Sequence, residues 1–329
     1  MRKLNYFQIK ILLLSFVATV ALGILVIPIL KRLKVGQIER EDGPQSHLSK
    51  QGTPTMGGVI LAGAITALII FVFLSYAKTE IELAKKLIPL ALISLGFGLV
   101  GFIDDIKKLV FKNTKGLKPA YKMIGLLAIA VLYVVYLIKI IDLGTDTYIP
   151  IFKVTIPLPI WLYMPFAIFV ILGTTNAINL TDGVDGLCPT ISAIIITCLT
   201  VIGIIYDVKE VVIFGTIVIG ACLGFLLFNM HPAKVFMGDT GSLLLGGVIV
   251  ALALYLKMPF ILIIIALIPV LETVSVIMQV LYFKRTGNRF FKMAPLHHHF
   301  ELSGWGENKV VSIFSILTLI LCIIGLLVI

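Results

Sequence analysis

Charged residues are scarce in this chain. Asp, Glu, Lys and Arg make up 13% of its 329 residues, where soluble proteins average about 25%. Hydrophobic residues make up 59%, and the mean hydropathy is +1.10. This composition excludes both a soluble globular domain and a disordered chain. The net charge of +10 forms no basic stripe with interleaved aromatic side chains, so we expect no nucleic-acid partner.

Several familiar motifs are also missing. The cysteines at 188, 198, 222 and 322 form no C-x-x-C pair and no zinc-binding spacing. A phosphate-binding G-x-x-x-x-G-K-[ST] loop and a G-x-S-x-G nucleophile elbow are absent. The one G-x-G-x-x-G match, at Gly96, Gly98 and Gly101, lies inside an apolar run with no strand before it. We interpret it as close packing between helices rather than as a dinucleotide site.

Long apolar runs dominate what remains. About 20 apolar residues cross about 30 Å of hydrocarbon as a helix, which satisfies every backbone amide internally. The sequence therefore predicts an all-α, polytopic membrane protein with about ten transmembrane helices, in one integral-membrane domain over 1–329. The run 260–283 contains Pro269 and Glu272, and we expect it to be broken or bent. The ten spans are 8–30, 55–76, 87–103, 120–141, 159–178, 187–206, 211–229, 242–256, 260–283 and 310–329.

Alternation of ten spans places the first, third, fifth, seventh and ninth connecting segments on one face of the membrane. Most of the 27 Lys and Arg residues lie on this face, here called the basic face. Lys78, Lys85 and Lys86 form a competing cluster on the other face. The positive-inside rule predicts that the basic face is cytoplasmic and that both termini are outside. The first span is too long for the core of a signal peptide, and we expect it to be retained.

Two adjacent carboxylates, Asp104 and Asp105, end the third span on the basic face. Like charges this close repel each other unless they share a proton or a divalent cation. Mg²⁺ is commonly held by one or two carboxylates together with substrate phosphates. The alternative is a solvated helix end, balanced by Lys107 and Lys108.

A second polar segment ends the fifth span. Its Asn and Asp residues recur every three positions, which places them on one stripe of a helix. Gly183 and Gly186 predict that the stripe ends in a turn. Such residues either face a ligand or serve only as capping and turn residues. The stripe consists of Asn176, Asn179, Asp182 and Asp185.

Two further segments enter spans from the basic face. Asp239, between Gly238 and Gly241, opens the eighth span. The N-terminus of a helix suits a phosphate group. The alternative is that the aspartate serves only as the N-cap of the helix. The segment 46–58 before the second span offers hydroxyls, Lys50 and backbone amides that suit an anion. A flexible loop is its alternative.

Three consecutive histidines, at 297, 298 and 299, lie in the longest connecting segment of the basic face. They cannot all ligate one metal ion from a regular helix, and no zinc-binding set accompanies them. Contact with phosphate groups or acid–base chemistry suits them better, and a polar loop is the alternative. With the acids and lysines, they predict Mg²⁺-assisted chemistry on phosphate groups with a lipid substrate. A transporter is the other class considered, because Glu272 lies inside a span, although transport sites lie near the midplane.

At these segments the sequence resembles the phospho-N-acetylmuramoyl-pentapeptide transferases, a branch of the polyprenyl-phosphate N-acetylhexosamine-1-phosphate transferases. The resemblance covers nearly the whole chain in the same motif order, with no departure at a motif position. The runs 53–58 and 295–301 distinguish this branch from relatives that transfer N-acetylglucosamine-1-phosphate. The matching segments are 50–58, 104–105, 176–186, 236–242 and 293–301.

The resemblance implies an enzyme that transfers phospho-N-acetylmuramoyl-pentapeptide from its UDP-linked precursor to undecaprenyl phosphate. The products would be lipid I and UMP, in the first membrane step of peptidoglycan synthesis at the bacterial inner membrane. The alternative is the sister activity on UDP-N-acetylglucosamine. The resemblance allows a homodimer, although the sequence itself encodes no oligomeric state.

The resemblance also implies roles for individual residues. Asp239 would be the principal Mg²⁺ ligand, with Asp104 and Asp105 near the metal. Attack by the lipid phosphate, either directly or through an Asp105-linked intermediate, is left open. The residues expected to be catalytic are Asp104, Asp105, Asp239, His297 and His298; those expected to bind substrate are Lys50, Thr55, Asn176, Asn179, Asp182, Asp185, Phe236, Gln279, Ala294 and His299.

Overall fold

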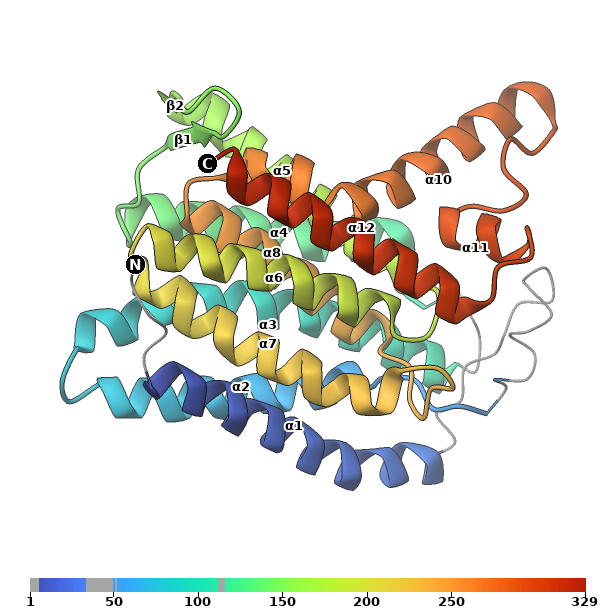
Figure 1. Ribbon diagram of the computed structural model, residues 1–329, viewed down its shortest axis with the longest axis horizontal. Coiled ribbons are helices and arrows are strands. Elements are labelled where there is room, and N and C mark those ends of the chain that lie inside the picture. The colour runs from blue at the N-terminus through green and yellow to red at the C-terminus, as the bar shows by residue number, and fades with distance from the viewer. Residues whose placement is uncertain (1–5, 34–49, 51, 112–115) are drawn as a thin grey trace.

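The computed structural model describes residues 6–33, 50, 52–111 and 116–329. Within them, ten helices are long and apolar enough to cross a membrane, which confirms the predicted all-α membrane architecture (Figure 1). These helices are α1 (Tyr6–Arg32), α2 (Gly58–Tyr76), α3 (Ile81–Val110), α4 (Pro119–Lys139), α5 (Ile160–Thr181), α6 (Leu187–Ile205), α7 (Lys209–Asn229), α8 (Gly238–Tyr255), α10 (Leu267–Thr286) and α12 (Glu307–Leu327).

The described parts of the connecting segments of the predicted basic face meet at one end of the bundle, at the right of Figure 1. There the segment before α2 pairs with the segment before α8, since Gly57 N–H donates to the carbonyl oxygen of Phe236 at 2.8 Å. The start of α1 and the end of α12 lie at the opposite end. Alternation of the spans therefore collects the polar segments in one region, as the sequence predicts.

Helix α8 lies at the centre of the bundle and is buried along almost its whole length. Glycines let its neighbours approach closely: a Cβ on Gly246 would lie 2.7 Å from the Thr175 backbone of α5. On α3, Gly98 faces Leu244, and Gly101 faces the backbone of Asp239 and Thr240. The glycines of the G-x-G-x-x-G match therefore serve helix packing, as interpreted from the sequence.

Helices α3 and α8 extend furthest beyond their predicted spans. Helix α3 has 30 residues and continues through both aspartates to Val110, whereas its apolar run ends near residue 103. Helix α8 begins at Gly238, four residues before the predicted start. Backbone hydrogen bonding does not stop where hydrophobicity stops, because polar residues also propagate a helix at the interface. Asp104 and Lys108 consequently lie one helical turn apart on the same face.

The ninth span is broken, as the sequence predicts. A short helical segment, η2 (Pro259–Ile261) followed by α9 (Leu262–Ile265), ends at Ala266, whose φ of −107° and ψ of 24° leave the helical region. Helix α10 then starts at Leu267, and Pro269 lies in its first turn, where a missing N–H costs no helical hydrogen bond. Helix α10 projects away from the bundle, above the short helix α11 (Leu296–Glu301) (Figure 1).

The structure adds a small hairpin that the sequence does not predict. Strands β1 (Asp146–Ile149) and β2 (Val154–Pro157) pair antiparallel, with Asp146 opposite Pro157. Each strand has four residues, too few to give a clear alternation of polar and apolar side chains. The hairpin lies at the end of the bundle opposite the polar segments (Figure 1).

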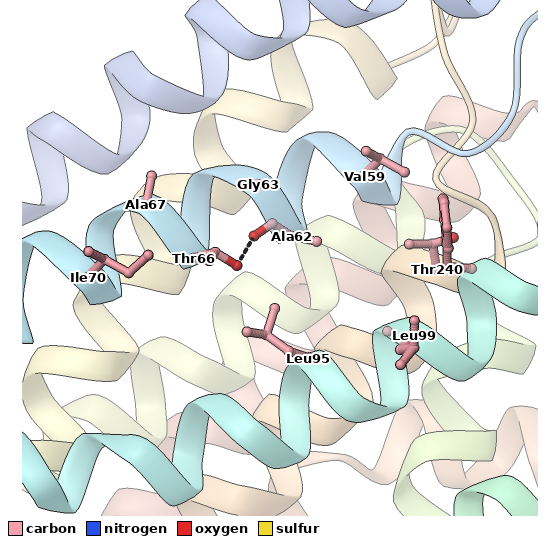
Figure 2. Close-up of a pocket in the computed structure, with 11 residues that line it drawn as sticks. Val59, Ala62, Gly63, Thr66, Ala67, Ile70, Leu95, Leu99 and Thr240 are labelled. Carbon is pink, nitrogen blue, oxygen red and sulfur yellow. Dashed lines mark hydrogen bonds between the residues drawn. The ribbon is translucent and has the colours of Figure 1, made fainter.

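An apolar groove of about 520 Å³ lies between α2 and α3 (Figure 2). Ala62 and Ile70 line one side, and Leu95 and Leu99 line the other, with Thr240 at one end. The hydroxyl of Thr66 donates to the carbonyl oxygen of Ala62 at 2.7 Å. The groove therefore offers mainly hydrocarbon to the surrounding lipid.

Candidate active site

Three carboxylates meet at the polar end of the bundle. Asp104 and Asp105 lie near the end of α3, and Asp239 is the second residue of α8. One oxygen from each lies within 4.8 Å of the others, and both α3 aspartates are 3% exposed. Gly101 makes this approach feasible, because any larger residue would collide with the backbone of Asp239. An all-oxygen set of three carboxylates suits a hard divalent cation such as Mg²⁺.

Asp105 caps α8. Its carboxylate accepts hydrogen bonds from the backbone N–H of Thr240 at 2.9 Å and of Asp239 at 3.2 Å, and from the Thr240 hydroxyl at 2.7 Å. Asp239 itself does not cap the helix: Met237 is at the N-cap position, with no side-chain cap. The capping alternative for Asp239 is therefore wrong, and its carboxylate is left for the cluster.

Two lysines offset part of the negative charge of the cluster. Lys108 Nζ lies 2.7 Å from an oxygen of Asp104 and 2.9 Å from Asp239 Oδ2. Lys122 Nζ lies 3.0 Å from the same oxygen of Asp239. Asn179 of α5 donates to Asp239 Oδ1 at 2.9 Å and to the Ser242 hydroxyl at 2.8 Å. Helices α3, α4, α5 and α8 thus supply one mixed acid and ammonium centre.

The stripe at the end of α5 ends as predicted. The helix stops at Thr181, and Gly186, with φ of 77°, begins α6 from the left-handed region. Asp182, at the C-cap of α5, is surrounded by acids: burial, and then the charges of Asp239, Asp105 and Asp185, raise its pKa to about 8. A carboxyl group with a raised pKa is a common feature of functional clefts.

A second cluster lies beside the first and joins four connecting segments. Lys50 Nζ contacts Asp185 at 2.8 Å and Glu307, at the start of α12, at 2.5 Å. His231 Nδ1 lies 3.0 Å from Asp185. Lys50 also lies 5.9 Å from the centre of the Phe236 ring. Of the segment 46–58, residues 46–49 and 51 lie outside the described residues.

Comparison with known proteins identifies the family. The model of glycosyl transferase family 4 matches residues 87–257, and a phospho-N-acetylmuramoyl-pentapeptide-transferase signature matches residues 50–60. A protein of that name from Acetivibrio thermocellus is 47% identical over 97% of this chain and 94% of its own length. Namesakes from Clostridium botulinum (47%, covering 98% of this chain and 96% of the relative) and Halalkalibacterium halodurans (48%, covering 92% and 91%) are similar.

The chain belongs to the phospho-N-acetylmuramoyl-pentapeptide transferase family. The signature covers Lys50, Thr55 and the start of α2, and the family 4 match covers the three carboxylates, Asn179 and both lysines. Thr55 Oγ1 lies 3.1 Å from where a Cβ on Gly238 would be, beside the carboxylates. In this transferase the segments that carry the family resemblance and the polar centre therefore coincide.

The three histidines of this transferase have different partners. His297 is fully buried, and a Cβ on Gly183 would lie 2.6 Å from its Cε1 atom and closer still to Nε2. His298 Nδ1 lies 2.8 Å from Glu301. His299 Nδ1 instead accepts from the backbone N–H of Lys292 at 3.2 Å, and its ring lies 5.6 Å from the ring of Phe291. The roles of all three remain predictions.

Three other predicted residues lie outside the two clusters. Asn176 donates to the Leu172 carbonyl oxygen at 2.7 Å, one turn back on α5. Gln279 accepts from the backbone N–H of Phe291 at 2.9 Å and so holds the loop after α10. Ala294 precedes α11 in the same loop. Their assignment to substrate binding stays a prediction.

Sequence reasoning missed four residues of the clusters as site residues. The spacing of Lys108 one turn after Asp104 is a usable signal, since the two pair on a continuous helix. Lys122, His231 and Glu307 carry no such signal. Each reaches its cluster across more than 40 residues of sequence, so only the packing of the helices reveals it.

Proposed function

We propose that this chain transfers phospho-N-acetylmuramoyl-pentapeptide from its UDP-linked precursor to undecaprenyl phosphate, giving lipid I and UMP. The observation that carries this function is the cluster of Asp104, Asp105 and Asp239 with Lys108 and Lys122 at one end of a membrane bundle. A cluster at that depth serves a phosphate on a lipid and a nucleotide from the aqueous side together. Phosphoryl transfer needs such charge stabilisation and alignment more than covalent chemistry by the protein.

The carboxylates are the residues that would hold Mg²⁺, with Asp239 as principal ligand. When bound, the ion neutralises charge on the pyrophosphate. Lys108 and Lys122 already contact Asp239, and their ammonium groups are placed to turn toward substrate phosphate oxygens. The chain thereby supplies positive charge around the reacting phosphorus from both of these lysines.

Direct attack accounts for the geometry better than an Asp105-linked intermediate. In the transfer, an oxygen of the lipid phosphate bonds to the β-phosphorus while the bond from that phosphorus to the UMP oxygen breaks. Both oxygens of Asp105 already accept hydrogen bonds from the start of α8, which lowers their nucleophilicity. Asp104 is the carboxylate we assign to accept a proton from the lipid phosphate.

The second cluster is assigned to the nucleotide part of the substrate. Lys50 and Asp185 offer an ammonium and a carboxylate at 2.8 Å from each other, with Phe236 close by. A donor, an acceptor and an aromatic ring together suit a uracil ring. Asn179 contacts Asp239, and Asp182 lies near Asp239, Asp105 and Asp185, so we assign both to the sugar phosphate.

Placement in the bacterial inner membrane, with the polar end facing the cytoplasm, follows from the same proposal. UDP-linked precursors are aqueous substrates of that side, and most basic residues lie on this face. A homodimer remains an expectation, to be checked by the mass of the purified protein in detergent.

The deciding experiment measures UMP release by the purified protein with Mg²⁺, undecaprenyl phosphate and the UDP-linked pentapeptide. We expect turnover in the wild type, loss of at least about 100-fold in Asp239→Asn, and an unchanged melting temperature within a few degrees. Removal of Mg²⁺ with EDTA should abolish turnover reversibly. Full activity of Asp239→Asn would refute the metal assignment, and preference for UDP-N-acetylglucosamine would favour the sister activity.

A further inference from the structure

A carboxylate outside both clusters is fully buried within a membrane helix. Glu272 lies in α10, one turn after Pro269, and is 0% exposed. A carboxylate in such surroundings is costly unless a partner compensates its charge. An acidic residue inside a broken membrane helix is also typical of transporters. The residue that Glu272 contacts therefore distinguishes a transport site from a role in the transferase site.

The partner is His297 of α11. Its ring Nδ1 lies 3.3 Å from Glu272 Oε1, the distance of an ion-pair contact. Its backbone N–H donates to the other carboxylate oxygen at 3.4 Å. Neither Nδ1 nor Oε1 has a hydrogen-bond partner among the described residues, so the ring is held by this close contact and by the backbone bond. Glu272 thus contacts both the ring and the backbone of His297 and holds the position of the ring.

The far side of the same ring faces the turn after α5. His297 Nε2 is buried and has no hydrogen-bond partner among the residues that the structure describes. This nitrogen lies against Gly183, which stands between Asp182 and Asp185 in the sequence. Only a residue without a side chain at position 183 leaves room for the ring. A buried imidazole nitrogen without a partner is destabilising. A group that binds in this region would satisfy it.

We propose that Glu272 is a positioning residue for His297, holding the ring so that Nε2 faces the turn 182–186, where it donates a hydrogen bond to a phosphate group of the substrate. The identity of that group rests on the proposed function. An imidazole ring that carries a proton on each nitrogen donates from both. The break at Ala266 contributes by directing α10 so that Glu272 reaches the histidine.

A double-mutant cycle tests this assignment. We expect His297→Ala to lower kcat about 100-fold and Glu272→Gln about tenfold, the latter mainly in kcat rather than KM. If Glu272 acts through His297, the double variant falls no further than His297→Ala alone. A double variant reduced by the product of the two losses, or an unaltered kcat in Glu272→Gln, would overturn the proposal.

Thr273→Val is the matched control. Its hydroxyl donates to the Pro269 carbonyl oxygen at 3.1 Å, and it neighbours Glu272 on α10 without contacting His297 in any described bond. We expect unchanged kcat and a small change in melting temperature. A loss in this control equal to that of Glu272→Gln would show that α10 tolerates no substitution and would refute the specific role.

Gly183→Ala keeps the test decisive if Glu272→Gln fails to fold. Its new methyl group would push the ring from the opposite side while leaving Glu272 intact. We expect about a tenfold loss of kcat that disappears in the His297→Ala background; full activity would overturn the proposal. If the wild type releases no UMP, the proposed function fails by itself. The double-mutant cycle is then measured by binding, as the rise in melting temperature that the UDP-linked precursor causes in each variant. If the losses of this rise in the two single variants add up in the double variant, the role of Glu272 is rejected.

Discussion

Gly101 allows the three carboxylates to meet, and Gly101→Ala tests whether their closeness matters. A Cβ at this position would lie 2.7 Å from the backbone nitrogen of Thr240 and closer to the carbonyl group of Asp239. Ordinary carbon contacts begin at about 3.5 Å. The neighbouring atoms belong to the backbone of α8 and cannot rotate away. The two helices must therefore part by about 1 Å.

The separation has two costs of known size. Forcing a methyl group into a packed contact costs about 1–3 kcal/mol of stability. Misplacing reacting groups by about 1 Å costs about 100-fold in rate. The bond from Thr240 N–H to Asp105 measures 2.9 Å, so the same shift would also break the cap of α8. We expect Gly101→Ala to lose about 100-fold in UMP release and to melt at a lower temperature.

Gly173→Ala is the control for this prediction. Gly173 lies in the middle of α5, and no heavy atom lies within 4 Å of where its Cβ would be. It should keep wild-type turnover and melting temperature. Measuring UMP release and thermal unfolding for both variants separates a general effect of alanine in a membrane helix from a collision at the site. Equal activity in the two variants would refute the reasoning.

Two further predictions concern pH and topology. The pKa of the Asp182 carboxyl is raised to about 8 in the folded chain, above its unfolded value, so the free energy of unfolding falls as pH rises from about 4 to about 8. Without divalent cations, the melting temperature of the wild type should therefore fall over this range more steeply than that of Asp182→Asn. Parallel curves for the two proteins would contradict this prediction. The four native cysteines are buried, so a maleimide that cannot cross the membrane should label only cysteines introduced at exposed positions. It should label Thr79→Cys in intact cells and Ser303→Cys only after the cells are permeabilised. The reverse labelling pattern would show the opposite orientation in the membrane.

Much of the architecture could be predicted because hydrophobicity is a local property. Each apolar run reports its own span, and the break near Pro269 follows from the chemistry of proline. The bounds of α3 could not be predicted, since the helix continues through Asp104 and Asp105 into polar sequence. The hairpin β1–β2 was missed for the opposite reason, because four residues give too little pattern.

The site was predicted in its region more than in its contacts. Asp239 and Asn179 could be placed on the same face by counting spans, and the structure brings them to 2.9 Å. Nothing in the sequence indicates that Lys122 completes this centre. The capping alternative for Asp239 failed because the cap comes from Asp105, 134 residues earlier in the chain.

The amino-acid sequence by itself determined that the chain crosses the bilayer ten times and that all its histidines and most of its acids gather on one side of it. That much depends only on the length and order of apolar runs. The tertiary structure alone decided which polar groups touch, such as Glu272 with His297 and Lys50 with Asp185 and Glu307. Those pairings depend on how each helix is rotated against its neighbours, which is set by close packing at residues such as Gly101 and Gly183.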